Sequence, residues 1–156
     1  MICDFCKKNG LGSFVDRPHI IIDGFMVTRP TKSFHDYHLL IFNTNRHRAH
    51  IHQYSKKDTS TLTAILRIID DVFADALSDY QGYNLMSNNG TVFAGQKIPH
   101  AHIHLFMRYT SESMSPYVRM NTGDFVNDKE TEMLKIPLAD VLNQIKETYE
   151  TTYHIQ

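Results

Sequence analysis

Three histidines occupy every second position between residues 100 and 104, in the segment His-Ala-His-Ile-His, which Leu105 and Phe106 follow. Successive side chains of a β-strand point to opposite faces, so His100, His102 and His104 would stand in one row with the apolar residues between them on the other face. Neutral imidazole serves as a nucleophile, a proton donor or a metal ligand. We therefore predict that this strand has one chemical face and one core face.

The residues before this row complete a specific pattern. They include the segments Asn88-Asn89-Gly90 and Gly95-Gln96-Lys97. Together with the three histidines, these segments resemble the histidine triad (HIT) family of nucleotide hydrolases and transferases. The resemblance is clearest over residues 3–108 and weaker over 109–156, and it implies a single HIT-like domain spanning 1–156.

The resemblance implies catalysis through a nucleotidyl-histidine intermediate. His102 would attack the α-phosphorus of a nucleoside phosphoramidate, a dinucleoside polyphosphate or a related nucleotide conjugate, and water or another acceptor would resolve the adduct. Attack needs a neutral ring with one nitrogen free, so we expect the other nitrogen to donate its proton to a backbone carbonyl. His104 would donate a hydrogen bond to the phosphate or orient the ring of His102.

The loop before the histidines is expected to bind the phosphate. Phosphoryl chemistry requires donors where negative charge gathers on the non-bridging oxygens. We predict that these donors are Asn88 or Asn89, Gln96, and backbone N–H groups around Gly95 and Lys97. Lys97 stands where members of the family commonly carry Ser or Thr. Either its charge reaches the phosphate, or its side chain points to solvent and only its backbone serves.

An apolar strand expected at residues 25–28 lies where the family usually places the pocket for the base. Phe25 and Val27 are candidates for the wall of that pocket, and plain core packing of both side chains is the alternative. Asp23, in the turn before this strand, lies near the place of the family's ribose-binding acid.

The two cysteines, Cys3 and Cys6, form Cys-Asp-Phe-Cys at the start of the chain. In a cytosolic protein this spacing favours half of a metal site over a disulfide, and two imidazoles would complete a tetrahedral zinc shell. In the zinc-containing branch that the chain resembles, the ligands correspond to Cys3, Cys6, His47 and His100. The resemblance thus implies a structural zinc that braces the histidine strand, while two free cysteines remain the alternative.

Charge and hydropathy limit the partners. The 156 residues carry a net charge of −1, with 16 basic and 17 acidic residues interspersed, so no basic surface is expected for a polymeric nucleic acid. There is no apolar run long enough for a bilayer and no signal peptide after Met1. We expect a cytoplasmic protein that binds a small nucleotide, away from membranes. The resemblance further implies a homodimer in which two sheets become continuous.

Periodicity predicts the elements that position these residues. Alternation and turn signals predict strands at about 19–22, 25–28, 37–42, 83–87 and 98–107, and helical spacing predicts helices at 58–78 and from Pro137 onward. The stretch 109–128 is only weakly patterned and is expected to be irregular. The resemblance implies an α+β fold with about five antiparallel strands, a long helix packed across the sheet and a C-terminal helix.

Histidines outside the row are interpreted more simply. His38, at the head of the 37–42 strand, is expected to be a hydrogen-bonded structural residue. His50 and His52 are expected to be solvated residues that lead to the long helix, which Ser55 or Asp58 is suited to cap.

Two other functions remain open. In the first, His100, His102 and His104 together bind a catalytic metal, although three ligands on one flat strand do not readily converge. In the second, the chain is a non-catalytic nucleotide-binding or interaction protein.

Overall fold

The computed structural model describes residues 3–127 and 134–153, and within them one antiparallel sheet has the strand order β1-β2-β3-β5-β4. The strands are β1 His19–Ile22, β2 Phe25–Thr28, β3 His38–Asn43, β4 Tyr80–Met86 and β5 His102–Tyr109. The α-helices are α1 Lys56–Ala76, α2 Pro116–Thr122 and α4 Leu138–Tyr153, and short 3-10 helices cover Lys7–Asn9, Gly12–Asp16, Ile51–Gln53 and Val92–Ala94. The predicted α+β fold is confirmed.

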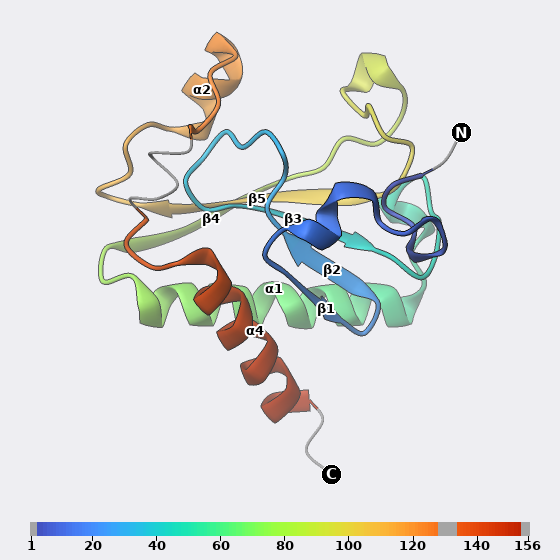
Figure 1. The fold of residues 1–156 in the computed structure, drawn as a ribbon, viewed down its shortest axis with the longest axis horizontal. Coiled ribbons are helices and arrows are strands. Elements are labelled where there is room, and N and C mark those ends of the chain that lie inside the picture. Colours follow the sequence, from blue (N-terminus) through green and yellow to red (C-terminus); the bar gives the residue numbers. More distant parts are fainter. Residues whose placement is uncertain (1–2, 128–133, 154–156) are drawn as a thin grey trace.

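Both long helices cover the same face of the sheet (Figure 1), where they bury the main core. The apolar residues of α1 recur at helical spacing, and Ile65 and Ile69 are among those that are almost completely buried. They pack in one cluster with Ile103 and Leu105 of β5. Full burial of one such side chain is worth about 1.5–3 kcal/mol, so this face fixes α1 across the sheet.

The start of α1 is capped by Ser55 and Asp58, as predicted. The Oγ atom of Ser55 accepts the N–H of Asp58 at 3.1 Å, and the carboxylate of Asp58 accepts the N–H of Ser55 at 3.0 Å. Each side chain satisfies a backbone donor that lacks an intrahelical partner. The helix therefore spans Lys56–Ala76, two residues earlier than the apolar pattern indicates.

The β1–β2 hairpin turns at Asp23 and Gly24, whose φ angles are +46° and +88°. Two central residues with positive φ make the primed turn whose twist suits a two-residue hairpin. A side chain at Gly24 would also meet Asn45, since a Cβ atom there would lie 2.5 Å from Nδ2 of Asn45. The strand boundaries predicted on either side of this turn are confirmed.

The N-terminal segment packs on the opposite face of the sheet. Phe5 stacks on Phe42 of β3 with ring centroids 4.1 Å apart, and Phe14 meets the same ring edge-on at 5.4 Å. These side chains form a second, smaller core with Met26 and Leu40. The packing brings the two cysteines against the end of β3.

Several predicted elements differ from the structure. The strand predicted at 83–87 is β4 Tyr80–Met86, which begins three residues earlier and includes Gly82. β5 begins at His102, so residues 98–101 lead into the strand and do not belong to it. The stretch expected to be irregular contains α2, in which Pro116 occupies the first turn and Gly123 ends the helix at a φ of +77°. Proline at the start and glycine after the end are helix signals that act without an apolar stripe.

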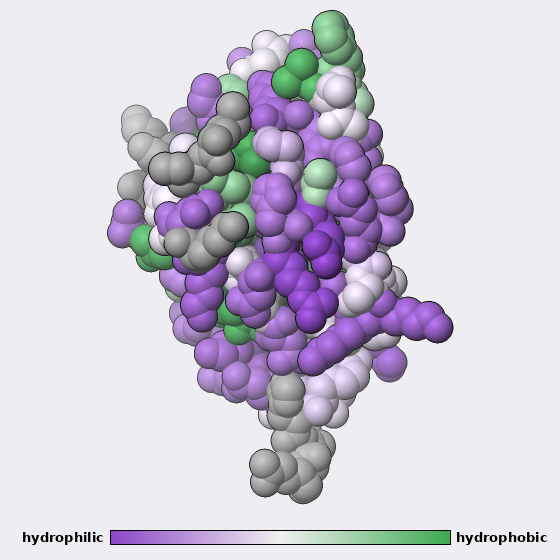
Figure 2. Space-filling model, turned by 90° about the vertical axis from the view of Figure 1, so that its right-hand side faces the viewer, coloured by the Kyte–Doolittle hydropathy of each residue, from purple (hydrophilic) through white to green (hydrophobic). Residues whose placement is uncertain are grey.

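The end of the molecule seen in Figure 2 carries the N-terminal segment and the connection between β4 and β5. Its surface is mostly hydrophilic, with one group of hydrophobic side chains at the upper right and smaller ones on the left. The connection exposes Val92 and Phe93, which are 67% and 100% accessible. Across the residues that the structure describes, every helix is too short or too polar to cross a membrane.

Candidate active site and metal centre

β5 carries two of the three predicted histidines on the face away from the helices. His102 lies opposite Phe42 of β3 and His104 lies opposite Leu40. Ile103 points to the main core under α1. The predicted separation into a chemical face and a core face is therefore confirmed within β5.

The ring of His102 is held in a single orientation by the backbone. Its Nδ1 atom lies 2.7 Å from the carbonyl oxygen of His100. A carbonyl only accepts, so Nδ1 carries the proton and Nε2 keeps a free lone pair. Burial lowers the pKa of His102, and the hydrogen bond to the carbonyl opposes this shift only in part. His102 is thus a neutral imidazole with one nitrogen available for attack.

His104 receives its orientation from His38, which extends the row to four histidines. The N–H of Phe34 donates to Nδ1 of His38 at 3.2 Å, so the proton of His38 is on Nε2. That Nε2 atom lies 2.9 Å from Nδ1 of His104 and donates to it. The proton of His104 is therefore on its Nε2 atom, and the ring is a hydrogen-bond donor beside His102, with centroids 5.1 Å apart.

Both rings of this pair are held neutral. Burial lowers the pKa of His38 well below its usual value, and the neighbouring His104 adds to the shift. Burial, and to a lesser extent the unfavourable electrostatic interaction that a protonated His104 would have with His102, lowers the pKa of His104 to about 4. Because both rings are neutral at ordinary pH, each keeps one nitrogen as a hydrogen-bond donor and the other as an acceptor. His38 is a buried, hydrogen-bonded residue, as predicted. Its partner His104 depends on the register of β3 against β5, which no local pattern carries.

The two cysteines, His47 and His100 meet at one point. One ligand atom from each of the four lies within 4.8 Å of all the others. Nδ1 of His100 is 3.4 Å from the sulfur of Cys3 and 3.6 Å from that of Cys6, and Nδ1 of His47 is 3.4 Å from the sulfur of Cys6. Bonds of about 2.3 Å to sulfur and about 2.0 Å to nitrogen place these atoms about 3.5 Å apart in a tetrahedral zinc shell. The donor set fits zinc.

A second hydrogen bond prepares His100 for this role. Its Nε2 atom donates to the carbonyl oxygen of Asn43 at 2.8 Å, which leaves the lone pair of Nδ1 facing the two sulfurs. Ligating histidines commonly donate their other ring proton to such an acceptor. Two sulfurs and two nitrogens would close a tetrahedral shell, so a metal here would connect the N-terminal segment to the residues before β5 and leave no open position for catalysis.

The predicted phosphate loop is braced by its own amides. Gln96 is almost completely buried, and its side chain donates to the carbonyl of Ala49 at 2.6 Å and accepts the N–H of Gly90 at 2.7 Å. Asn88 donates across the loop to the carbonyl of Gly95 at 3.2 Å. These contacts fix the path of the chain between β4 and the histidines, and the phosphate-binding roles stay predictions.

Other predicted contacts lie in different surroundings. Phe25 and Val27 are 1% and 0% exposed and belong to the core under α1, which supports the core-packing alternative. Asp23 accepts the hydroxyl of Tyr149 from α4 at 3.0 Å. The side chain of Lys97 is exposed, and Asn89 accepts the N–H of Ile51 at 2.8 Å.

The three histidines of the row face different partners. His100 is directed to the cysteines, His102 to a backbone carbonyl and His104 to His38. At least one ring nitrogen of each histidine is therefore committed to a different partner. This arrangement disfavours a catalytic metal shared by all three.

Comparison with known proteins agrees with this geometry. The profile of the HIT domain family matches residues 21–111. An uncharacterised HIT-like protein of Methanocaldococcus jannaschii is 36% identical over 67 residues, which cover 43% of this chain and 42% of that protein. The chain therefore spans less than half of the length of this relative.

Two solved structures share the whole fold. A zinc-bound histidine triad family protein from Mycobacterium smegmatis superposes with a TM-score of 0.66 at 18% identity, covering 94% of this chain and 96% of its own. A hypothetical histidine triad nucleotide-binding protein from Sulfolobus tokodaii gives a TM-score of 0.62 at 18% identity, covering 96% and 93%. At this identity the likeness establishes the fold.

Proposed function

The chain belongs to the HIT domain family, and we propose that it is a nucleotide hydrolase or nucleotidyltransferase that uses His102 as its nucleophile. The observation that carries this proposal is the hydrogen bond of 2.7 Å from Nδ1 of His102 to the carbonyl of His100. It fixes the tautomer in which Nε2 is free to attack phosphorus.

In the proposed first step, Nε2 of His102 forms a bond to the α-phosphorus of a nucleoside phosphoramidate, a dinucleoside polyphosphate or a related conjugate. The bond from phosphorus to the leaving group breaks, and the leaving group takes the electron pair. Water or another acceptor then attacks the nucleotidyl-histidine and restores the free ring. His104 supports both steps, because its Nε2 proton is available to an oxygen of the phosphate.

The loop before β5 is proposed to hold the phosphate. The loop precedes the histidines in the sequence and exposes, fully or in part, the side chains of Asn88, Asn89 and Lys97. The buried amide of Gln96 keeps the backbone of this loop in place. Gln96 acts in this proposal as a brace, since both ends of its amide already have backbone partners. Gly95 adopts a φ of +82°, and a Cβ atom there would lie 2.8 Å from Nδ2 of Asn88.

Zinc, held by Cys3, Cys6, His47 and His100, is proposed as a structural metal. When bound, it would supply a rigid cross-link between the N-terminal segment and the residues before β5. Since His100 also provides the carbonyl that orients His102, the same residue would connect the metal centre to the nucleophile.

A homodimer is proposed as the assembly. β4 lies at one edge of the sheet, so a second copy of that strand has room to continue it. Tyr83 and Leu85 of β4 are 37% and 46% exposed. Sedimentation at several protein concentrations tests this proposal, and a monomer at every concentration would contradict it.

The decisive experiment for the function is capture of the covalent adduct. We would mix the protein with labelled adenosine and guanosine phosphoramidates and dinucleoside polyphosphates, quench within milliseconds to seconds, and locate the label by peptide mass spectrometry. Label is expected on His102. His102→Ala should lose the adduct and at least about 10³-fold of turnover while still binding the nucleotide.

The matched control is His52→Asn, which changes an exposed histidine of the Ile51–Gln53 turn. It should label and turn over like the unaltered protein. Turnover that survives in His102→Ala would refute the mechanism. Nucleotide binding without any turnover or adduct in the unaltered protein would favour the non-catalytic alternative.

A further inference from the structure

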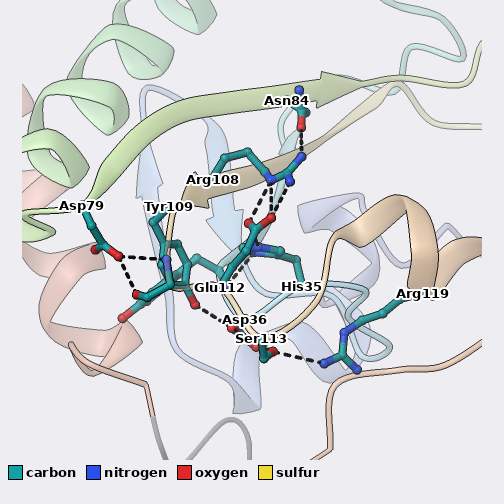
Figure 3. A network of polar contacts seen from close by, with 11 residues as sticks. His35, Asp36, Asp79, Asn84, Arg108, Tyr109, Glu112, Ser113 and Arg119 are labelled. Atoms are coloured by element: carbon teal, nitrogen blue, oxygen red, sulfur yellow. Dashed lines mark hydrogen bonds and ion pairs between the residues drawn. The ribbon is translucent and has the colours of Figure 1, made fainter.

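A buried polar network joins the turn before β3 to the residues that follow β5 (Figure 3). His35 is completely buried, and its Nε2 atom lies 2.8 Å from Oε2 of Glu112. The same carboxylate accepts Nε of Arg108 at 2.9 Å, and a terminal nitrogen of Arg108 donates to the side-chain oxygen of Asn84 at 2.7 Å. The turn before β3 is thus connected through Glu112 to both β5 and β4.

The protons in this network have definite positions. The N–H of Tyr37 donates to Nδ1 of His35 at 3.2 Å, so the proton of His35 is on Nε2 and points to Glu112. Burial lowers the pKa of His35 although Glu112 opposes the shift, which keeps the ring neutral. Burial raises the pKa of Glu112, but hydrogen bonds from Arg108 and His35 outweigh it and keep the carboxylate ionised.

A second contact secures the neighbouring residue of the turn. The carboxylate of Asp36 accepts the hydroxyl of Tyr109 at 2.5 Å, and Ser113, which approaches Asp36 at 3.5 Å, accepts from Arg119 of α2 at 3.4 Å. Consecutive side chains of the turn are therefore fixed by residues that follow β5.

The same turn determines which ring nitrogen of His38 carries the proton. Phe34 precedes His35 directly, and its N–H donates to Nδ1 of His38 at 3.2 Å. A hydrogen bond of this length is lost when the turn moves by a few tenths of an ångström. Without that donor, the proton of His38 is free to occupy Nδ1, and Nδ1 of His104 then loses the donor that now holds its own proton on Nε2.

We propose that Glu112 is a positioning residue: through His35 it fixes the turn at Phe34, and through His38 it keeps the proton of His104 on Nε2, beside the nucleophile. The inference rests on the proposed function of His102 and His104. Its basis is two sets of hydrogen bonds that the backbone of the turn joins. Glu112 and the N–H of Tyr37 hold His35, and the N–H of Phe34, the residue before His35, holds His38 against His104.

The competing explanation is that the ion pair between Glu112 and Arg108 serves only to stabilise the fold. Buried ion pairs add little net stability, because the desolvation of both charges offsets their attraction. The two explanations differ in what happens to the tautomer of His104 when the charge of Glu112 is removed.

The test compares Glu112→Gln with Asp79→Asn. Asp79 is a matched carboxylate, since it holds the same segment after β5 by accepting the N–H of Ser111 at 3.0 Å and pairing with Lys135 at 3.2 Å, without reaching the turn at His35. Imidazole ¹⁵N shifts in the full-length protein report the tautomers of His38 and His104. Steady-state kinetics on the best nucleotide report kcat and KM separately.

In the unaltered protein and in Asp79→Asn, His104 should show a single tautomer with the proton on Nε2. Glu112→Gln should show a mixture of tautomers. We expect kcat to be lower by roughly tenfold with KM unchanged, because only part of the molecules then keep the Nε2 proton with which His104 assists the reaction. If Glu112→Gln does not fold, Asn84→Ala removes only the outermost contact of Arg108 and should give the same mixture at lower amplitude.

The inference is overturned when His104 keeps its single tautomer in Glu112→Gln or, where that variant does not fold, in Asn84→Ala. It is equally overturned when Asp79→Asn lowers kcat as much as Glu112→Gln does. A protein that turns over no nucleotide at all would refute the proposed function instead, and the ¹⁵N shifts would still decide whether Glu112 controls the proton of His104.

Discussion

His38 of β3 and His104 of β5 share a hydrogen bond of 2.9 Å, although they are 66 positions apart in the sequence. His38 is one strand away from the row and diagonal to His104, which pairs directly with Leu40. The bond makes the functional row a set of four imidazoles, in which the fourth determines which nitrogen of the third carries a proton. Activity should therefore depend on a hydrogen-bond donor at position 38 that reaches Nδ1 of His104, and not on the presence of an imidazole ring there.

This dependence is tested by two substitutions at one position. His38→Gln keeps an amide N–H near the place of Nε2, whereas His38→Leu removes the donor and leaves Nδ1 of His104 buried without it. We expect kcat to fall about 10²-fold in His38→Leu and less than about tenfold in His38→Gln, on the scale of a general acid–base group. Steady-state kinetics measure both, and equal losses in the two variants would contradict the role assigned to the hydrogen bond.

The sequence identifies the residues of a strand face but not their neighbours on other strands. Alternation in the 100–106 segment predicted correctly that His102 and His104 lie opposite Ile103 in the pleat, because one face of β5 is core and the other polar. The pairing of His38 with His104 depends on the register of β3 against β5, which no local pattern carries. The contact of His35 with Glu112, 77 residues apart, is hidden for the same reason.

Burial on both faces removes the pattern altogether. All four residues of β2 are buried, so its apolar run contains no alternation that would assign Phe25 and Val27 to the helix side and Met26 to the side of Phe42. The sequence of β2 alone therefore leaves two alternatives for Phe25 and Val27, the wall of a base pocket and plain core packing, and their burial under α1 favours core packing. The hairpin turn and the cap of α1, by contrast, depend on single residues whose local chemistry is sufficient.

The pH dependence of kcat/KM follows from the lowered pKa of His102. Protonation of Nε2 removes the attacking lone pair, so activity is present above the pKa of His102 and is lost as the pH falls through it. Burial places that pKa below the ordinary value of 6.5. We therefore expect a flat profile above pH 6.5 and an acid limb below it, measured with a dinucleoside polyphosphate because its charge stays constant over this range.

Circular dichroism and metal content at each pH are the controls for that profile, since loss of the fold or of a metal in acid would also reduce the rate. An acid limb at or above pH 6.5 with the fold intact would show that the neutral ring of His102 does not govern the reaction.

The proposed metal centre would hold one zinc per chain, which we expect to find in protein purified under reducing conditions. Cys6→Ser should lose the metal, while His50→Asn, which changes a nearby histidine outside the four-residue cluster, should keep it. Removal of zinc should lower the melting temperature, because a ligand present at about 10³ times its Kd adds about 4 kcal/mol to stability. Turnover should persist in chelator at temperatures where the fold survives; its stoichiometric loss and recovery with metal would indicate a catalytic ion instead.

Asp58 connects the cap of α1 to the cluster of Cys3, Cys6, His47 and His100 through Asn43. We therefore expect its replacement to lower both the stability of the helix and the affinity for the proposed metal. Its carboxylate accepts Nδ2 of Asn43 at 3.2 Å as well as the N–H of Ser55, and the carbonyl of Asn43 accepts Nε2 of His100. Ser55→Ala should reduce the free energy of unfolding by about 1 kcal/mol through loss of the cap.

Asp58→Ala should cost more, about 2–3 kcal/mol, because it also leaves the buried amide of Asn43 without its acceptor. Zinc affinity should fall by about tenfold in Asp58→Ala alone, as is usual when an outer contact of a ligand is disturbed. Urea unfolding and competition with a zinc chelator measure the two effects, with Ser60→Ala on the exposed side of the same helix as the control. Equal zinc affinity in all three variants would show that Asn43 holds His100 without help from α1.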